Sequence, residues 1–464
     1  MMAAEVDLRE WETASPAPGS VLGWESFGGD RAGRAAAESL TKENRMQVLE
    51  LVKGLEIRAT SFVGKLQLGP IEITIRPKLS GTPLLNLLRY AYGLRDLSLH
   101  GETVFSASAG GFQDLLIQQL AMEAQELISR GLHRDYISVT EDLSGPRGRI
   151  DFARYLGTYV RAGTSLPCMH NPRSEDNLLN RVLLAGLVLS ESLTSDRELR
   201  FKIVRLSKRL EESVSTVELD QSILREAWWA MDRRTKSYES AVTLIELLVD
   251  AAGASFSGGE PLQLSGFLFD MNRFFQALLS RFLREHLRGF DLEDERRLNG
   301  TFAYDPQRNP QFRRAPTPRP DFVVLRDRKI VAVLDAKYRD LWERTLPESM
   351  LYQLSIYALC HSMPQRAATI LYPTLEANAA EQSIFIKDAF HGSSQAQINL
   401  RPVNLLLMDK LLQNGSGANT LRQRQELAIQ LAFGNNQSTT IIRTSHQRRS
   451  ILLRWPRCHV VLTS

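Results

Sequence analysis

The residues best suited to chemistry lie within residues 319–337, where two acidic side chains frame two short apolar runs. The runs are separated by the charged residues 326–329, which is typical of a β-hairpin turn. If the hairpin is centred on Arg328, paired residues have numbers that sum to 656, so Asp321 faces Asp335. Directly opposed residues have Cβ atoms about 4.5–5.5 Å apart. This spacing predicts that the two carboxylates can share one divalent cation.

A lysine completes this arrangement. Side chains alternate along a strand, so Asp335 and Lys337 project from the same face of the second strand. Two carboxylates this close repel each other, and their pKa values shift unless a cation compensates their charge. Carboxylate oxygens suit Mg²⁺ or Mn²⁺, which keep several water molecules and bind phosphate groups. The predicted metal ligands are therefore Asp321 and Asp335, with the Lys337 ammonium beside them.

The Asp-x-Lys pattern occurs twice in the chain, in different surroundings. The first copy, residues 327–329, lies in the predicted turn, where charged side chains are solvated. The second copy, residues 335–337, ends the apolar run 330–334, where burial of a carboxylate and an ammonium would be costly without a purpose. The hairpin alone leaves two interpretations open, a metal site and a surface ion pair.

A helix predicted from Glu348 to Cys360 supplies two further polar candidates. Gln353 and Tyr357 are four residues apart and therefore share one face of this helix. The apolar side chains of the helix can pack on the sheet while Gln353 and Tyr357 point toward the edge that carries the carboxylates. The alternative is that both are ordinary polar positions on a half-exposed helix.

The composition is that of an ordinary globular protein. The chain has 464 residues, of which 43% are hydrophobic and 24% charged, and its formal net charge is +4. These values exclude a wholly disordered chain, a collagen-like fibre and a disulfide-rich scaffold. Three scattered cysteines fit a reducing cytosol, no run of 18 apolar residues occurs, and the N-terminus does not resemble a secretory signal. We therefore predict a cytoplasmic protein without a membrane segment.

Changes in sequence pattern divide most of the chain into four parts. Residues 1–45, rich in Ala, Gly, Ser and Glu, are interpreted as a loosely ordered lead-in. Residues 46–110 contain short alternating segments that predict a small β-rich domain, and residues 111–255 show helical periodicity. Residues 256–405 are expected to form a mixed α/β domain that opens with a long helix over residues 267–287.

The remaining segment, residues 406–464, is a basic C-terminal tail. Its last part, residues 421–464, holds seven arginines and a single glutamate. Such a segment can bind nucleic acid through phosphate groups, and it can equally be a solvated or partly disordered terminus. One hypothesis is therefore a DNA-binding protein that works through this tail.

The motifs taken together resemble a known family. Asp321, the Asp335-x-Lys337 tripeptide and the Gln353/Tyr357 pair are similar to the PD-(D/E)xK nuclease signature. The wider chain resembles McrC, the nuclease subunit of the McrBC restriction system for 5-methylcytosine. The segments that carry this second resemblance are, in order, ITIRPKL (73–79), LRYAYG (88–93), GPRGRIDF (145–152), DNLLNR (176–181), FDMNRFF (269–275), LDAKY (334–338) and ILYP (370–373).

The resemblance implies an α+β multidomain protein with a β-rich N-terminal domain, a helical middle domain and a C-terminal α/β nuclease domain built on a mixed sheet. It also implies Mg²⁺ (or Mn²⁺) as the cofactor. The substrate would be methylated double-stranded DNA, cleaved to 5′-phosphate and 3′-hydroxyl ends. Asp321 and Asp335 would hold the metal, Lys337 would orient or help deprotonate the attacking water, and Gln353 and Tyr357 would support them.

The resemblance implies a partner as well. In this family the β-rich and helical parts dock on an AAA+ GTPase ring, McrB, so residues 46–255 are predicted to be the partner-binding arm. The chain itself has no G-x-x-x-x-G-K phosphate loop, because Ala59 occupies the glycine position before Gly64-Lys65. An energy-driven system would therefore need its motor on another chain.

One position departs from the family pattern. The family usually has Glu after the paired aromatic residues of the first nuclease-domain helix, and this chain has Gln276. An amide can coordinate metal or position water but contributes no charge, which leaves the number of metal ions open. The difference favours an alternative function, that of a non-catalytic adaptor which stimulates the GTPase ring and retains the nuclease fold as a scaffold.

Overall fold

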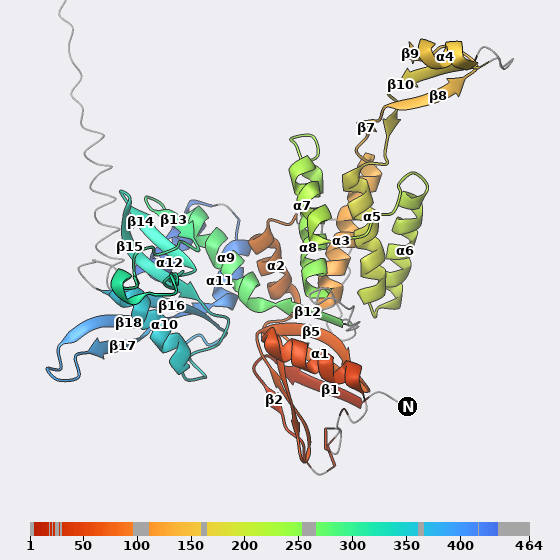
Figure 1. The fold of residues 1–464 in the computed structure, drawn as a ribbon. Helices are drawn as coiled ribbons and strands as arrows, with labels where there is room; N and C mark the ends of the chain where they lie inside the picture. The colour runs from red at the N-terminus through yellow and green to blue at the C-terminus, as the bar shows by residue number, and fades with distance from the viewer. Residues whose placement is uncertain are drawn as a thin grey trace, which may run out of the picture. The chain divides into compact units, whose positions relative to one another are not determined.

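The structure is a computed structural model. It describes residues 4–17, 19, 20, 22, 23, 27, 30–95, 111–158, 165–252, 266–360, 366–415 and 417–434. These residues form a mixed α+β chain with several sheets (Figure 1), as the sequence predicts at this coarse level. The chain divides into two compact units, Met1–Lys78 with Arg95–Phe269 and Leu79–Leu94 with Asp270–Ser464. The five-part division drawn from the sequence stays a prediction, and its boundary between residues 255 and 256 lies outside the described residues.

The first unit begins with two small sheets and helix α1 (Arg31–Lys42). Their strands are β1 (Ala4–Arg9), β2 (Thr13–Ala14), β3 (Met46–Leu51), β4 (Gly54–Ala59), β5 (Phe62–Leu68), β6 (Ile71–Arg76) and β12 (Gly266–Asp270). One sheet has the order β1-β6-β5-β12 and the other the order β2-β4-β3. The apolar residues of β6 alternate, and Ile71, Ile73 and Ile75 are all buried, as expected for a strand with one face on the core.

The N-terminal segment is more ordered than the sequence suggests. Strand β1 pairs in parallel with β6 along its whole length, and its alternating Val6 and Leu8 are buried. Helix α1 begins after Asp30, whose side chain caps the helix by accepting a hydrogen bond from the backbone N–H of Gly33. The expectation of a loosely ordered lead-in over residues 1–45 is therefore wrong for β1 and α1.

A helical bundle and a β-rich arm form the rest of the first unit. The bundle contains α3 (Phe112–Arg130), α5 (Leu178–Leu193), α6 (Arg197–Glu211), α7 (Gln221–Ala230), η1 (Lys236–Tyr238) and α8 (Glu239–Ala252). The arm lies between α3 and α5 and contains β7 (Asp135–Tyr136), β8 (Val139–Leu143), β9 (Arg149–Ile150), α4 (Phe152–Thr158), β10 (Leu166–His170) and β11 (Arg173–Ser174). Figure 1 shows the arm extending away from the bundle.

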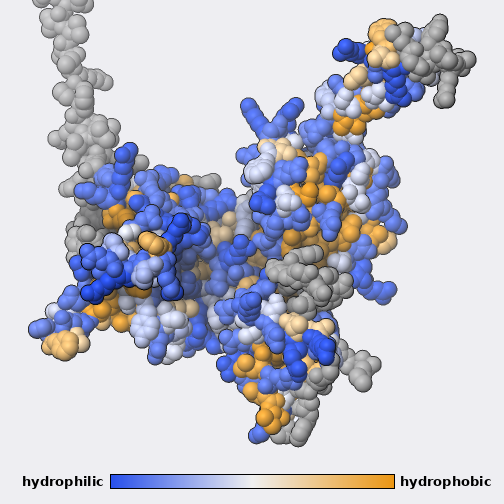
Figure 2. All heavy atoms as spheres, viewed as in Figure 1, coloured by the Kyte–Doolittle hydropathy of each residue, from blue (hydrophilic) through white to orange (hydrophobic). Residues whose placement is uncertain are grey.

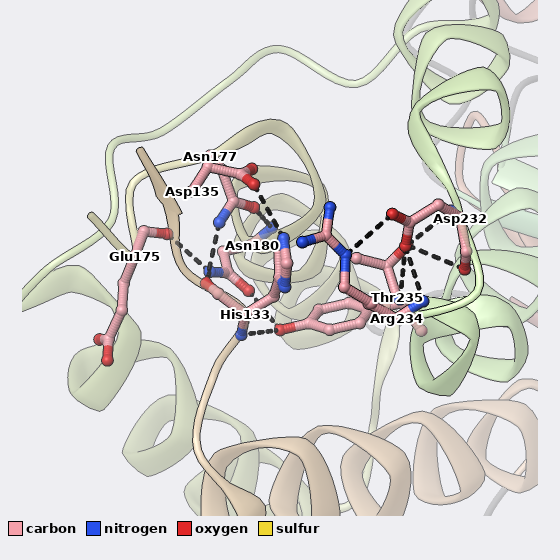
Figure 3. A network of polar contacts seen from close by, with 9 residues as sticks. His133, Asp135, Glu175, Asn177, Asn180, Asp232, Arg234 and Thr235 are labelled. Atoms are coloured by element: carbon pink, nitrogen blue, oxygen red, sulfur yellow. Dashed lines mark hydrogen bonds and ion pairs between the residues drawn. The ribbon is translucent and has the colours of Figure 1, made fainter. Parts of the chain in front are cut away.

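A polar network fixes the base of this arm to the bundle (Figure 3). The backbone carbonyl of His133 accepts hydrogen bonds from the side-chain amides of Asn177 and Asn180, at 2.9 and 3.0 Å. The backbone N–H of His133 donates to the Tyr238 hydroxyl at 2.9 Å, and that hydroxyl donates to Asn180 Oδ1 at 2.6 Å. Burial raises the pKa of Tyr238 to about 12, so the hydroxyl keeps its proton. The arm therefore leaves the bundle from a rigid point.

The second unit is built on a six-stranded sheet. Its strands, in spatial order, are β13 (Asp291–Asp294), β14 (Phe322–Arg326), β15 (Lys329–Ala336), β16 (Ala367–Thr374), β18 (Ser394–Asn404) and β17 (Gln382–Lys387). The three central strands β15, β16 and β18 run parallel, and the remaining neighbours are antiparallel. Central parallel strands are buried on both faces, which fits the nearly continuous apolar runs of β15 and β16.

The helices of this unit are α2 (Gly81–Tyr92), α9 (Met271–His286), η3 (Pro306–Arg308), α10 (Glu348–Leu359), α11 (Leu405–Gln413) and α12 (Ala418–Phe433). Helices α9, α10, α11 and α12 contact the sheet. Helix α10 packs on β16 and β18 through Leu354 and Tyr357, as the predicted helix from Glu348 should, and α9 packs on β13 and β15. Helix α2 belongs to this unit and packs on α9, although its sequence lies within the predicted β-rich part.

Helix α9 starts later than predicted. Residues 267–270 belong to strand β12, and the helix begins at Met271 because the Asp270 side chain accepts a hydrogen bond from the backbone N–H of Asn272 at 2.9 Å. The aromatic residues Phe274, Phe275 and Phe282 of the helix are fully buried. The continuous apolar pattern conceals this boundary, because a buried strand and a buried helix face look alike in sequence.

The basic tail is described only as far as Gly434. Two of its arginines lie on α12 and have structural partners: Arg422 pairs with Glu426 at 2.9 Å, and Arg424 donates to backbone carbonyls at the end of α11. Residues 435–464, which hold the other five arginines, lie outside the described residues. The DNA-binding hypothesis for residues 421–464 is therefore untested.

Strand β17 leaves an apolar surface exposed at one edge of the sheet. The hairpin of β17 and β18 carries Ile384, Phe385 and Phe390, of which Phe390 is 95% exposed. Figure 2 shows apolar surface at the tip of this hairpin, beside a mostly hydrophilic face of the same unit.

Among the helices of the described residues, none combines the length and the apolar character that a membrane-spanning segment needs.

The packing of β12 on β5 gives a first testable prediction, at Gly64. This residue has φ +138°, and a Cβ added to it would lie 2.1 Å from the backbone oxygen of Phe267. We expect Gly64→Ala to lower the stability of the first unit by about 2–4 kcal/mol, because it adds both backbone strain and a steric clash. Thermal unfolding followed by circular dichroism should show a midpoint lower by roughly 5–10 °C.

The control for this experiment is Gly145→Ala, where an added Cβ meets nothing within 4 Å. Gly145 shows no positive φ, so alanine should fit without strain. A Gly64→Ala protein that unfolds at the wild-type temperature would contradict the close approach of the two strands.

Candidate active site

The hairpin of β14 and β15 has the predicted register at its open end. Phe322 pairs with Leu334, so the residue numbers sum to 656 as expected, and Asp321 and Asp335 follow at the next position of each strand. Near the turn the pairing shifts by one residue, and Arg326 lies opposite Lys329. The pairing predicted from a hairpin centred on Arg328 is therefore correct at the site and wrong by one residue at the turn.

A β-bulge reconciles the two ends of the hairpin. The pairing shifts after Val324, and Val331 is the extra residue on β15. Both residues of the two-residue turn, Asp327 and Arg328, have positive φ values of 52° and 63°, as a type I′ turn requires. Without the bulge, a one-residue slip would turn one of the two carboxylates to the opposite face of the sheet.

The three predicted charged groups meet at this open end. The Lys337 Nζ lies 2.8 Å from Asp335 Oδ2 and 3.7 Å from Asp321 Oδ2. Asp321 Oδ2 also accepts a hydrogen bond from the backbone N–H of Ala336 at 2.7 Å, which ties the residue before β14 to the end of β15. One ammonium therefore bridges two carboxylates that come from adjacent strands.

Burial makes the electrostatics of this cluster strong. The Asp335 side chain is 2% exposed, and those of Asp321 and Lys337 are 19% and 24% exposed. Burial and the neighbouring Asp335 charge raise the pKa of Asp321 to about 6, although Lys337 acts in the opposite direction. Burial lowers the pKa of Lys337, but Asp335 and Asp321 outweigh it and the net shift is upward. Lys337 is therefore an ammonium at neutral pH and acts as a donor and a positive charge, not as a base.

The residues present fit a divalent cation. Asp335 Oδ1 is buried and has no hydrogen-bond partner, which leaves an acceptor that costs stability unless a ligand uses it. Within the described residues, no three or more His, Cys, Asp or Glu side chains are grouped to hold a metal ion. Two carboxylates with water and substrate oxygens completing the shell suit Mg²⁺, which rarely occupies an all-protein cage.

Gln276 lies beside the cluster. It projects from α9, and its Nε2 donates to Asp321 Oδ1 at 3.3 Å. Asp321 therefore has a hydrogen bond on each carboxylate oxygen, from Gln276 and from the backbone of Ala336. A glutamate at position 276 would bring a third negative charge to this place, whereas the amide positions Asp321 without adding charge.

Gln353 and Tyr357 are linked by hydrogen bonds to the backbone that precedes Asp321. Gln353 Nε2 donates to the Tyr357 hydroxyl at 2.7 Å, and that hydroxyl donates to the backbone carbonyl of Arg319 at 3.0 Å. Neither side chain forms a hydrogen bond to Asp321 or Asp335 in the described structure. They hold the peptide that leads into Asp321, which is a positioning role.

Sequence reasoning missed residues that also position the site. Asn272 Oδ1 accepts a hydrogen bond from the backbone N–H of Tyr338 at 3.0 Å, so α9 holds the residue after Lys337. The backbone N–H of Glu295 donates to the Asp321 carbonyl at 2.8 Å. The segment FDMNRFF, which contains Asn272, offered a signal for the first contact. No sequence pattern indicated the second.

Comparison with known proteins identifies the family. The sequence model of the family described as "McrBC 5-methylcytosine restriction system component" matches residues 57–373, which is more than half of the chain. The chain belongs to this family, the one that its resemblance to McrC predicted. No curated protein matches the sequence.

Two solved structures are similar to the chain. One belongs to a refined half-complex from the tetradecameric assembly of Thermococcus gammatolerans McrB AAA+ hexamers with bound McrC. Its TM-score is 0.59 and its identity 18%, over 91% of this chain and 98% of that one, which indicates a shared fold. The other is the cryo-EM structure of the Thermococcus gammatolerans McrBC complex, with a TM-score of 0.43 and 18% identity over 61% of this chain and 88% of that one.

The raised pKa of Asp321 generates a prediction about metal binding. A metal ligand must be deprotonated, so protonation of Asp321 below pH 6 removes one of the two anionic ligands. We expect Mn²⁺ affinity, measured by isothermal titration calorimetry, to be highest above pH 7 and to fall as the pH drops from 7 through 6 to 5. In the Asp321→Asn variant, which has no carboxylate to titrate there, affinity should be weak at every pH and nearly flat over this range. Equal wild-type affinities at pH 5 and pH 7.5 would contradict the assignment.

Proposed function

We propose that this protein is the Mg²⁺-dependent endonuclease subunit of a McrBC-like restriction system and that it cleaves methylated double-stranded DNA in the cytoplasm. The observation that carries the proposal is the meeting of Asp321, Asp335 and Lys337 at the end of a buried hairpin, in a chain that belongs to the McrBC family. A mixed sheet with parallel central strands and helices α9 and α10 against it supports a PD-(D/E)xK nuclease fold.

Hydrolysis requires water to attack the phosphorus while the P–O3′ bond breaks, which leaves a 5′-phosphate and a 3′-hydroxyl end. Asp321 and Asp335 would hold Mg²⁺ or Mn²⁺, and when bound the ion supplies positive charge to the phosphate and acidifies water. The Lys337 ammonium donates to the attacking water or to a phosphate oxygen and stabilises the charge that develops there. Gln353 and Tyr357 keep Asp321 in place through Arg319.

The partner would be an AAA+ GTPase ring. The structurally similar complex contains McrB AAA+ hexamers with bound McrC. We propose that residues 46–255 dock on such a ring and stimulate it, since these residues include strands β3 to β6, the bundle and the arm. A rigid arm base at His133 suits a segment that must transmit position to a partner.

A second candidate function is a non-catalytic adaptor of the GTPase ring. Gln276 favours it, because the amide beside Asp321 supplies no negative charge and weakens the site for a second cation. Under this alternative the wild-type chain stimulates GTP hydrolysis by the ring but cleaves no DNA at any Mg²⁺ or Mn²⁺ concentration.

The nuclease proposal predicts the effects of two substitutions at the site. Asp335→Asn removes a metal ligand, and Lys337→Ala removes the ammonium, while neither changes the fold. Each should reduce cleavage of methylated plasmid DNA by about a hundredfold or more, in an assay with the partner ring, GTP and Mg²⁺. Stimulation of GTP hydrolysis should remain, which would show that the variants still bind the partner ring and have lost only the cleavage step.

The first Asp-x-Lys tripeptide, residues 327–329, supplies matched controls. Asp327→Asn and Lys329→Ala change the same residue types in the exposed hairpin turn, and asparagine tolerates the positive φ at position 327. Both controls should cleave as the wild type does. Wild-type cleavage by the Asp335→Asn protein would sink the assignment of the active site.

A further inference from the structure

Residues 296–320, here called the arginine loop, connect β13 to the candidate active site. The loop contains six arginines and a single acidic residue, Asp305, for a net charge of +5 by subtraction. Most of its residues are exposed, including the aromatic side chains of Phe302, Tyr304 and Phe312. An exposed stretch that combines arginines with aromatic residues is unusual unless it binds a partner.

Both ends of the loop are anchored at the site. The backbone N–H of Glu295 donates to the Asp321 carbonyl at 2.8 Å, and that of Leu298 donates to the Pro318 carbonyl at 2.9 Å. Arg319 forms an ion pair with Glu295, and its carbonyl accepts the Tyr357 hydroxyl. The chain therefore leaves the site and returns to it directly before Asp321, which fixes the loop next to the place where a phosphodiester would lie.

The tip of the loop presents one aromatic ring to solvent. Phe312 is 90% exposed and has φ +51°, a left-handed conformation that bulky residues rarely adopt. Asn309 holds this turn with both ends of its amide: its Oδ1 accepts from the Arg313 N–H and its Nδ2 donates to the Arg313 carbonyl, each at 2.9 Å. The turn thus maintains a strained backbone that directs a large apolar side chain outward, as is common at binding sites.

The charges of the loop are only partly compensated. Arg296, Arg308 and Arg319 have acidic neighbours. Arg297, Arg313 and Arg314 have no carboxylate within ion-pair distance among the residues that the structure describes. Two of these three, Arg313 and Arg314, follow Phe312 directly in the chain, so the tip carries an aromatic ring and two guanidinium groups without a carboxylate partner among the described residues.

We propose that the tip of the arginine loop, Phe312 with Arg313 and Arg314, is a DNA-binding element that holds the duplex beside the cleavage site. This inference rests on the proposed nuclease function. The guanidinium groups would bind backbone phosphates, and the Phe312 ring would contact a base step from the groove, as apolar wedges do in proteins that deform DNA. DNA is favoured over a protein partner because the free charges are all positive and the loop is anchored at the carboxylate that the scissile phosphate must approach.

The test measures DNA binding separately from cleavage. The full chain is titrated onto a fluorescently labelled methylated duplex in EDTA, and anisotropy is recorded between 50 and 200 mM salt, a range over which phosphate contacts dominate affinity. The Arg313→Ala/Arg314→Ala double variant should bind more weakly, and its slope of log K against log salt should be smaller by about 1.8. Phe312→Ala should weaken binding on the order of tenfold with the slope unchanged, because it removes no charge.

Each variant has a matched control in the same unit. Phe390→Ala removes an equally exposed phenylalanine from the β17–β18 hairpin. Arg328→Ala/Lys329→Ala removes two adjacent exposed charges from the turn of the β14–β15 hairpin, at the opposite end from the site. Both controls should bind the duplex as the wild type does.

Three results would overturn the proposal. Wild-type DNA affinity in both loop variants would exclude the loop as a DNA contact. Equal weakening in the Arg328→Ala/Lys329→Ala control would show that only net charge matters, and equal weakening in Phe390→Ala would show that the position of the exposed ring does not matter. Unchanged DNA binding with loss of binding to the partner ring would show that the loop serves a protein partner. These outcomes are distinct from failure of the nuclease assignment, in which Asp335→Asn still cleaves DNA while the loop variants bind it more weakly.

Discussion

The repulsion between two buried carboxylates is the constraint on which the candidate site depends. Asp321 and Asp335 lie on adjacent strands within reach of one ammonium, and their proximity contributes to the high pKa of Asp321. Lys337 compensates one of the two negative charges when both acids are ionised. The remaining charge and the unpartnered Asp335 Oδ1 leave the cluster incomplete in a way that a divalent cation would resolve. The fold maintains this arrangement at a cost to stability, which is typical of a functional site.

The surrounding elements hold the carboxylates in place from several directions. The bulge near Val331 sets the register of the hairpin, so both acids reach the same end and the same face. Helix α9 contacts Asp321 through Gln276 and the segment after Lys337 through Asn272. Helix α10 acts through Tyr357 on the peptide before Asp321. Three separate elements therefore restrict the hairpin end, and none of them places another charge on the carboxylates.

The sequence was sufficient where the signal is local and periodic. The charged turn between two apolar runs predicted the hairpin. The alternation of side chains along a strand placed Asp335 and Lys337 on one face, and the predicted pairing placed Asp321 across from Asp335 on the neighbouring strand. The predicted pairing was right at the site only because the bulge offsets the one-residue error at the turn. Bulges depend on twist and packing across the sheet, so no pattern within the hairpin reveals them.

The sequence failed where tertiary contacts decide the structure. Strand β1 is ordered because it pairs with β6, more than sixty positions away in the chain. No pattern within residues 1–45 indicates this strand pairing. The start of α9 was misplaced because one apolar run serves first as a strand and then as a helix face. Gln353 and Tyr357 were expected to point toward the carboxylates. Their hydrogen bonds lead to the Arg319 carbonyl, although the charges of Asp335, Asp321 and Lys337 still act on Tyr357. Helix periodicity predicts that two residues share one face of a helix, but not which groups of the protein that face contacts.

Under the proposed function, charge balance would separate DNA binding from DNA cleavage. With both carboxylates ionised, Asp321, Asp335 and Lys337 sum to one negative charge, which repels a phosphate until a divalent ion reverses the sign. The arginine loop, with a net charge of +5, would attract the same phosphate at any metal concentration. A duplex could therefore bind at the loop before the site is competent to cut. Cleavage would then depend on the cation and on whatever the partner does to bring the scissile bond from the loop to Asp321, so binding and chemistry would respond to different signals.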